Sequence, residues 1–299
     1  MILLLKSVVA VEKKIKLYKN FICDNVRLIL EILIMILVIL LPSWFDFNGA
    51  LLDGKISNIL NYSEILTYIL RESDHFSQFC FNVNNFLMGM ALFIMAFMAV
   101  RKFNSDYIMN TSEIYHDYPY RWYQFCASIL GVKTCFLIRV PIYIQFQIVI
   151  NGIFKEVFTE KEEYGSVENE KITNKFIGNI SENTQEINIV LEDTYPIEIG
   201  QLPDEKRGLT TIKISRSAEK FYLRCYSKNF IDDITKIVRN LPEGIIVNLY
   251  ATTNPKHTKS IAENVFNLGN DRQNVKHLYV FQQKHDKKRI FGFPGHRIF

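Results

Sequence analysis

The sequence has few of the short motifs that mark enzymes and metal sites. Its six histidines form no HExxH or HxH pair, and no GxSxG nucleophile turn occurs. The five cysteines are scattered without a CxxC pair, which excludes a zinc ribbon, and their odd number argues against a disulfide framework. We therefore expect no catalytic activity, no metal ion and no cofactor, and a reducing compartment for the soluble part of the chain.

Charge of one sign is also not in large excess. The chain has 35 lysines and arginines against 31 acidic residues, so its formal net charge of +4 gives no argument for a DNA partner. Hydrophobic residues instead make up 48% of the 299 residues, and the mean hydropathy is +0.04. These values are high for a soluble protein, and the apolar residues gather in particular stretches.

Two stretches are long and apolar enough to cross a membrane. Residues 28–45 read LILEILIMILVILLPSWF, with Glu31 as the only charge, and residues 80–100 carry no formal charge. Since a helix rises about 1.5 Å per residue, each stretch covers most of a hydrocarbon core about 30 Å thick. The sequence predicts two transmembrane helices here, and two buried helices of a soluble core are the alternative.

The basic residues indicate an orientation for these spans. Five lysines precede the first span, and Arg101 and Lys102 directly follow the second. The loop between the spans holds two basic residues against five acidic ones. Because lysine and arginine concentrate on the cytoplasmic side, we expect a multi-pass protein of the inner (plasma) membrane with both termini in the cytoplasm and an external loop between the spans.

Glu31 is a charged residue inside the first predicted span. A carboxylate within a membrane is costly and usually faces protein or water. Glu31 is therefore either a functional group or a partner of Arg27, which lies one turn earlier near the membrane surface. The pairing is favoured, because Glu31 is close to the end of the span.

The segment 119–154 is apolar but interrupted by charges and a proline. We predict a helix at 122–130 and, from the alternation of IYIQFQIVI at 142–150, one or two strands. The alternative is a third span over 135–154, which would place the rest of the chain outside the cell. Residues 155–186 are rich in Glu, Lys, Asn and Ser, which predicts a solvated linker.

Strands and helices alternate in the C-terminal part of the chain. Buried-type runs predict strands at 186–193, 209–216, 220–227, 244–251 and 275–283, and helical spacing predicts helices at 230–241 and 258–268. Such alternation is typical of βαβ units on a parallel sheet. We expect an α+β membrane protein with a transmembrane region at 1–102, a membrane-proximal segment and linker at 103–185, and a cytoplasmic α/β, Rossmann-like sensor domain at 186–299.

The loop ATTNPKHTK at 251–259 joins a predicted strand to a predicted helix. Ligands of open α/β sheets bind at this edge, and the free N–H groups of a helix start suit phosphate. The candidate ligand-binding residues of this loop are Thr252, Thr253, Asn254, Lys256, Thr258 and Lys259. The turn at 192–196 reaches a similar edge and adds Asp193, Thr194 and Tyr195, whose ring can stack on a base. A plain helix-capping loop is the open alternative.

Two groups of basic residues accompany this edge. Lys256 and Lys259 are three residues apart at the predicted helix start, so we expect them to face the same way and to hold phosphate. The chain after residue 270 carries seven further lysines and arginines against two aspartates. This basic tail is a solvated hairpin, a surface facing anionic lipid headgroups, or the rim of an anionic ligand pocket.

Two spans followed by an α/β domain with a phosphate-suited edge resemble the membrane effectors of bacterial cyclic-nucleotide defence systems, of the transmembrane SAVED/CARF-like or two-span STING-like type. The resemblance implies a CARF-like sensor fold, a cyclic di- or oligonucleotide ligand, a homo-oligomer, and an effector that disrupts the inner membrane in anti-phage defence. In SAVED and CARF domains nucleotide contacts come from loops after the strands, which map here onto 252–259 and 193–195. The alternative is a membrane-anchored protein-docking module with no nucleotide ligand.

Overall fold

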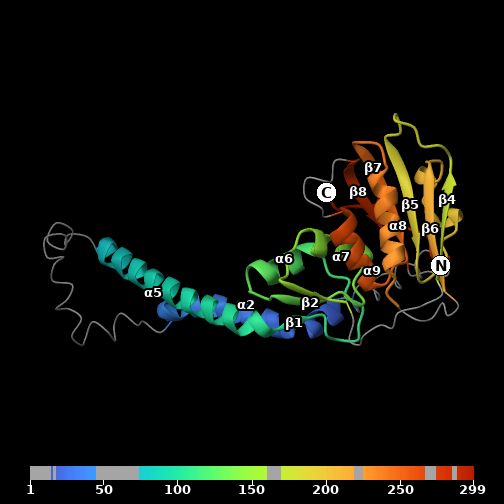
Figure 1. Ribbon diagram of the computed structural model, residues 1–299. Coiled ribbons are helices and arrows are strands. Elements are labelled where there is room, and N and C mark those ends of the chain that lie inside the picture. Colours follow the sequence, from blue (N-terminus) through green and yellow to red (C-terminus); the bar gives the residue numbers. More distant parts are fainter. Residues whose placement is uncertain are drawn as a thin grey trace, which may run out of the picture. The chain divides into compact units, whose positions relative to one another are not determined.

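The computed structural model describes residues 15, 18–44, 74–159, 170–218, 225–266, 274–284 and 288–299. Its contacts divide the chain into two compact units, whose elements are labelled in Figure 1. The helical unit comprises Met1–Tyr107 and Ser128–Val132, and the sheet unit comprises Ile108–Ala127 and Lys133–Phe299. The three-part division expected from the sequence stays a prediction.

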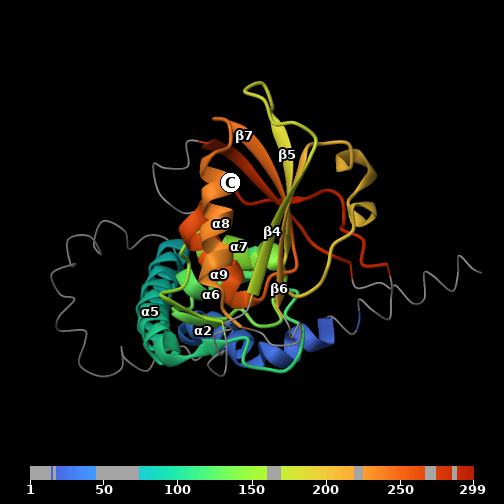
Figure 2. The ribbon, with the colours of Figure 1, turned by 45° about the vertical axis from the view of Figure 1, so that its right-hand side comes forward.

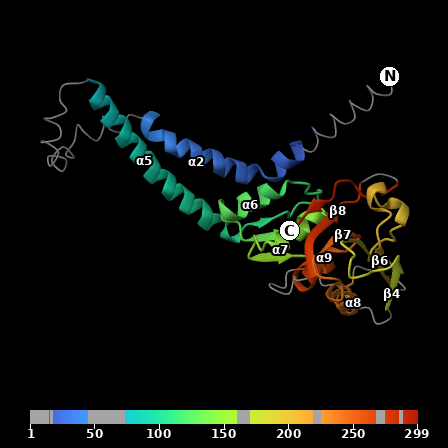
Figure 3. The same cartoon turned by 90° about the horizontal axis from the view of Figure 1, so that it is seen from above.

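Two long apolar helices, α2 (Val26–Trp44) and α5 (Asp74–Phe103), pack along each other in the helical unit (Figure 3). The stretch Phe86–Asp106 is a helix long and apolar enough to cross a membrane. The helical pieces Tyr18–Asp24 and Val26–Pro42 are bent by 73° and give a second candidate if they form one span. Both predicted spans therefore fall on helices of the structure.

Many apolar side chains of these two helices point outward. The exposed ones are Val26, Leu30, Leu33, Ile34, Ile36, Leu37 and Leu40 on α2, and Phe86, Leu87, Ile94, Met95, Met98 and Phe103 on α5. Soluble proteins rarely expose apolar surface of this extent. Between the helices, a Cβ atom added to Gly89 would lie 2.5 Å from the backbone oxygen of Ile39, a close approach that is typical of membrane helix pairs.

A polar cluster ties the start of α2 to the residues after α5. Arg27 Nε lies 3.1 Å from Glu31 Oε1, and Arg27 Nη2 donates to Asn104 Oδ1 over 2.9 Å. Asn104, in the short helix η3 (Asn104–Asp106), also donates to the second oxygen of Glu31. The guanidinium carbon lies 4.5 Å from the ring centroids of both Phe103 and Tyr107. The predicted pairing of Glu31 with Arg27 is confirmed.

The sheet unit begins with a small parallel sheet, in the order β1 (Ile108–Met109), β2 (Thr134–Phe136) and β3 (Glu156–Phe158). Helix α6 (Tyr120–Ser128) precedes β2, and it confirms the predicted helix with a shift of two residues. Helix α7 (Ile142–Ile150) lies between β2 and β3 in the chain.

The prediction of a strand at 142–150 is wrong, because these residues form α7. Six of its nine residues are buried, namely Ile144, Gln145, Phe146, Ile148, Val149 and Ile150. A helix packed on nearly all sides shows no amphipathic period, so its apolar alternation imitated a strand. At about 1.5 Å per residue the helix spans about 14 Å, too short to cross a membrane. All residues of 135–154 are described, and no third span lies there.

Within the described residues, the main sheet has six strands in the order β4-β6-β5-β7-β8-β9. The strands are β4 (Glu170–Ile177), β5 (Glu186–Glu192), β6 (Thr211–Ala218), β7 (Ile245–Ala251), β8 (Val275–Phe281) and β9 (His296–Arg297). The central four, β6, β5, β7 and β8, are mutually parallel, whereas β4 and β9 pair antiparallel at the edges. Four of the five predicted strands are confirmed, and the strand at 220–227 falls mostly outside the described residues.

The predicted linker at 155–186 is wrong in part, because it contains β3 and β4. Most of the side chains of β4 are exposed, and among the described strands it pairs with β6 alone. An edge strand is held by backbone hydrogen bonds on one side, so it needs no apolar face and its composition resembles a loop.

Helices α8 (Lys228–Arg239) and α9 (Pro255–Ile261) lie together on one face of the sheet (Figure 2). The apolar residues of α8 have the predicted spacing, and Ser227 caps its start. Helix α9 begins three residues before the predicted start at 258. Asn254 is its N-cap and Pro255 its first residue, a pairing of cap and proline that favours helix initiation.

The strand order creates a switch point between β5 and β7. From β5 the chain continues to β6 on one side, and from β7 it continues through α9 to β8 on the other side. The carboxyl ends of the two strands therefore open into a crevice that neither connection covers, which is where open α/β sheets bind ligands.

Candidate functional site

The two predicted turns meet at this switch point. Because β5 and β7 are parallel neighbours, Asp193–Tyr195 and Thr252–Asn254 leave the sheet side by side. The backbone N–H of Thr194 donates to the carbonyl of Thr252 over 3.2 Å. The hydroxyl of Thr252 donates to the carbonyl of Tyr195 over 2.8 Å. The structure thus joins both stretches that the sequence indicated.

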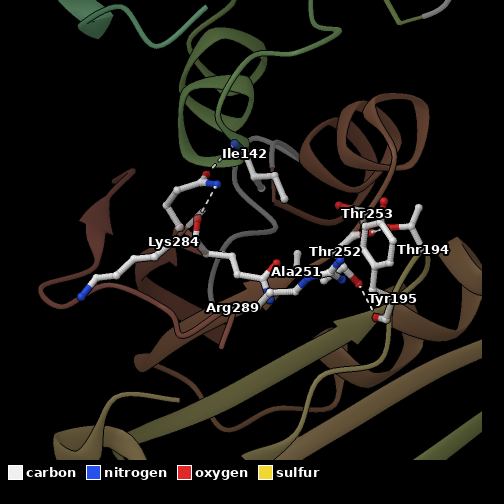
Figure 4. A pocket seen from close by; sticks show the side chains of 10 residues that line it. Ile142, Thr194, Tyr195, Ala251, Thr252, Thr253, Lys284 and Arg289 are labelled. Atoms are coloured by element: carbon white, nitrogen blue, oxygen red, sulfur yellow. Dashed lines mark hydrogen bonds between the residues drawn. The ribbon is translucent and has the colours of Figure 1, made fainter. Parts of the chain in front are cut away.

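A cavity of about 480 Å³ opens beside these turns (Figure 4). Its lining residues are Ile142, Thr194, Tyr195, Ala251, Thr252, Thr253, Gln282, Gln283, Lys284 and Arg289. Four of them are among the nine candidate residues from the sequence. The volume lies within the range of about 300–1,000 Å³ that is usual for small-molecule sites.

The cations of the cavity come from the basic tail, for which the rim of an anionic ligand pocket was one of three alternatives from the sequence. Lys284 and Arg289 both follow β8 in the chain, and both side chains are exposed. The guanidinium carbon of Arg289 lies 4.6 Å from the centroid of the Tyr195 ring. Figure 4 shows Arg289 extending toward Tyr195, while Lys284 points away from the other labelled side chains. The basic composition of the tail was the available signal.

We call the described residues of 282–292 the basic arm, and several contacts anchor it. Gln283 and Phe291 form an antiparallel bridge, and the N–H of Phe291 donates to the carbonyl of Gln201 over 2.9 Å. The buried ring of Phe291 packs edge-on against Tyr250, with centroids 5.2 Å apart. The arm is therefore fixed to the sheet at its base, and it carries Arg289 toward the cavity.

Two glutamines form another part of the cavity wall. Gln282 Oε1 accepts from the N–H of Ile142, at the start of α7, over 2.9 Å. Gln283 Nε2 is buried and has no hydrogen-bond partner within the described part of the chain. A buried amide without a partner is costly. An acceptor atom of a bound molecule would relieve that cost.

Five predicted residues do not line the cavity, namely Asp193, Asn254, Lys256, Thr258 and Lys259. The side-chain oxygen of Asn254 accepts from the N–H of His257 over 2.9 Å, which caps α9. Thr258 lies in α9 with its hydroxyl 2.7 Å from that of Thr253. The capping role left open by the sequence is thus confirmed for Asn254.

The two lysines of α9 contact different neighbours. Lys256 Nζ lies 5.4 Å from the ring centroid of Tyr226, and Lys259 Nζ donates to the carbonyl of Val157 over 3.0 Å. As i and i+3 residues of α9 the two lysines start from neighbouring positions on the helix, but their ammonium groups contact different partners and neither residue lines the cavity. Their binding of phosphate stays a prediction that the cavity does not support.

A buried ionic network holds the two turns together. Arg216 Nη2 lies 2.6 Å from Asp193 Oδ1, and Asp193 Oδ2 accepts from the N–H of Asn254 over 3.0 Å. His257 Nδ1 lies 2.7 Å from the same Oδ2, while His257 Nε2 accepts from the N–H of Ser227 over 2.8 Å. The second contact places the proton of a neutral His257 on Nδ1, where it is donated to Asp193.

The electrostatics of Asp193 follow from this network. Burial alone would raise its pKa, but the hydrogen bond from His257 and the nearby charge of Arg216 outweigh burial, so the pKa of Asp193 lies below its usual range. Ser227 accepts from the N–H of Phe230 as the cap of α8, and it meets His257 through its backbone N–H. Asp193, His257 and Ser227 therefore have the contacts of a structural network, not those of an activated nucleophile.

No three His, Cys, Asp or Glu side chains within the described ranges come together in a way that could hold a metal ion. The chemistry that the cavity offers is stacking, hydrogen bonding and positive charge.

Comparison with known proteins identifies the family. A sequence profile described as the SMODS- and Ubiquitin system-associated 2TM effector domain, SUa-2TM, matches residues 13–299. The chain belongs to the SUa-2TM effector family. The match covers both units, and the family's name agrees with two predicted spans. No curated protein matches the chain.

The SUa-2TM chain also has distant likenesses among solved structures. One is the Cap4 SAVED/CARF-domain containing receptor of Acinetobacter baumannii with the cyclic trinucleotide 2'3'3'-cAAA, at 6% identity and a TM-score of 0.39. The same receptor with 3'3'3'-cAAA gives 7% and 0.38. The first match covers 60% of this chain and 41% of that one, so the chain spans less than half of the receptor's length. Scores this low carry no argument about ligand or mechanism.

Proposed function

We propose that this SUa-2TM protein is a membrane effector of anti-phage defence that binds a cyclic di- or oligonucleotide and then disrupts the inner membrane. The observation that carries the proposal is the cavity at the β5–β7 switch point. It brings an exposed tyrosine, threonine hydroxyls and the cations of the basic arm together. Family membership supports the same reading, because the family is described as an effector domain with two transmembrane helices.

The cavity lining suits the parts of a nucleotide. A base can stack on Tyr195, whose ring is 50% exposed. Arg289 and Lys284 supply positive charge for phosphate, and charge-assisted hydrogen bonds are stronger than neutral ones. The unpartnered Nε2 of Gln283, within the described chain, can donate to an acceptor of the ligand.

The helical unit suits the effector role. The outward apolar side chains of α2 and α5 favour lipid as a neighbour, and the lysine distribution favours termini in the cytoplasm. We propose that ligand binding gathers several copies into a homo-oligomer, so that several α2–α5 pairs act on one patch of bilayer. We also propose that the chain acts without a catalytic step of its own.

A dye-release experiment tests this function. The full-length chain is reconstituted into liposomes that hold a self-quenching dye, and a panel of cyclic di- and trinucleotides is added. We expect at least one to release dye, and Arg289→Ala to raise its half-maximal concentration by roughly tenfold or more, since a charged hydrogen bond is lost. Lys288→Ala is the matched control, because Lys288 is exposed near Arg289 and does not line the cavity.

The outcomes separate the parts of the proposal. Binding of a cyclic nucleotide without dye release would reject membrane disruption and keep sensing. A chain that binds none of the panel would reject sensing and favour the alternative, a membrane-anchored protein-docking module.

A further inference from the structure

Tyr195 and Arg289 line the cavity from two different segments of the chain and contact each other. Tyr195 follows β5, whereas Arg289 belongs to the basic arm (Figure 4). The guanidinium carbon lies 4.6 Å from the ring centroid, which is within range of a cation–π interaction. Arg289 also has a backbone φ of 50°, a left-handed conformation that few residues other than glycine adopt. This backbone conformation has a cost for a residue with a side chain.

The contact has a consequence for any base that stacks on Tyr195. Stacked rings lie about 4.5–7 Å apart between centroids, so a base and the guanidinium cannot share the same face of the ring at the observed distance. Arg289 is exposed and its side chain is long, so it can leave the ring while its backbone stays anchored through Phe291. A guanidinium that leaves the ring needs a new partner, and phosphate is a suitable one.

We propose that Tyr195 and Arg289 form a paired recognition device for ligands that carry both an aromatic base and a phosphate. The base replaces the guanidinium on the ring, and the displaced guanidinium pairs with a phosphate of the same ligand. A phosphate without a base has to compete with the ring for Arg289, and a base without a phosphate leaves Arg289 without its partner. The device therefore favours nucleotides over either fragment. This inference rests on the proposed function, because it assumes that the cavity takes a nucleotide.

The proposal predicts effects of opposite sign for one substitution. In Tyr195→Leu a nucleotide loses its stacking surface, and affinity should fall by roughly tenfold. The same change frees Arg289, so the affinity for inorganic pyrophosphate should rise by about twofold to fivefold, the equivalent of an exposed cation–π contact. Tyr195→Phe keeps the ring and should behave like the wild type with both ligands.

The test is calorimetry on the full-length chain in lipid nanodiscs, with the cyclic nucleotide panel and with pyrophosphate at low ionic strength. Phe293→Leu is the matched control, because Phe293 is an equally exposed aromatic residue, 53% against 50% for Tyr195, and does not line the cavity. The paired device would be overturned if Tyr195→Leu left the nucleotide affinity unchanged. It would also be overturned if this variant lost affinity for both the nucleotide and pyrophosphate. If the wild type bound no nucleotide, the proposed function would fail instead, and the pyrophosphate result alone would decide whether the ring competes for Arg289.

Discussion

Asp193 and Thr194 are neighbours in the chain, but their side chains have different surroundings. The carboxylate of Asp193 is fully buried and is bonded by Arg216, Asn254 and His257. Thr194 lines the cavity, and its hydroxyl keeps acceptor capacity beyond the bond it donates to Thr252. The first residue belongs to a closed network, and the second belongs to an open surface.

The same contrast separates the other polar residues of this edge. Asn254 and His257 form their hydrogen bonds with other groups of the protein. Tyr195, Gln283 and Arg289 instead line the cavity with aromatic or polar groups. The comparison shows that residue type and position at the sheet edge are not enough to indicate a ligand contact. A residue at this edge is a candidate ligand contact when the polar groups of its side chain are not already fully bonded within the protein.

The largest expected effect is on the closed network. Asp193→Ala removes the partner of a buried Arg216, and breaking a buried ion pair on one side typically costs about 3–5 kcal/mol of unfolding free energy. Arg289→Ala, on the open surface, should stay within about 0.5 kcal/mol. Denaturant unfolding of the full-length variants in detergent measures both. If the two variants were equally stable, the claim that Asp193 has a structural role and Arg289 does not would be wrong.

The network also predicts how stability depends on pH. Because the folded pKa of Asp193 lies below its unfolded value of about 3.9, its contribution is present above that value and is lost as pH falls through the folded pKa. Unfolding free energy should therefore fall below about pH 4 less steeply in Asp193→Asn than in the wild type, by up to about 1.4 kcal/mol per pH unit. Unfolding curves between pH 3 and pH 6 give the slopes, and identical slopes would contradict the network's charge pairing.

The sequence predicted the two turns because each follows a buried parallel strand with its own local pattern. It gave the basic tail as the rim of a ligand pocket only as one of three alternatives, because the bridge between Gln283 and Phe291 and the contact of Arg289 with Tyr195 arise only in the tertiary fold. It also placed the start of α9 three residues too late, so Lys256 was read as a loop residue. Helix α7 was predicted as a strand because it is buried on nearly all sides and has no polar face. Strand β4 was predicted as a linker because most of its side chains are exposed.

A smaller effect on stability, opposite in sign to that of Asp193→Ala, is expected at Gln283. Gln283→Leu removes a buried amide nitrogen that has no partner among the described residues, so stability should stay level or rise by up to about 1 kcal/mol. Ligand affinity should fall by roughly tenfold, because the donor to the ligand is lost. Thermal unfolding and calorimetry on the same preparation measure the two quantities. If the variant were less stable and its ligand affinity unchanged, Gln283 would have a structural role and no role in ligand binding.

The smallest effect is expected for the lysines of α9. Because Lys256 and Lys259 contact Tyr226 and Val157 outside the cavity, the double change to alanine should alter stability by about 0.5 kcal/mol or less and leave ligand affinity unchanged. Calorimetry beside Arg289→Ala provides the comparison. A hundredfold loss of ligand affinity in the double variant would instead show that the phosphate site lies at the start of α9.

Photo-crosslinking tests the central claim, that the ligand lies between the two turns and the basic arm, most directly. The full-length chain in nanodiscs is labelled with cyclic nucleotides that carry an azido group on the base, and the modified peptides are mapped. The account predicts that label falls on 194–195, 252–253 and 282–292, and that excess unmodified ligand removes it. Competed label on 256–260, or on the helical unit alone, would contradict it.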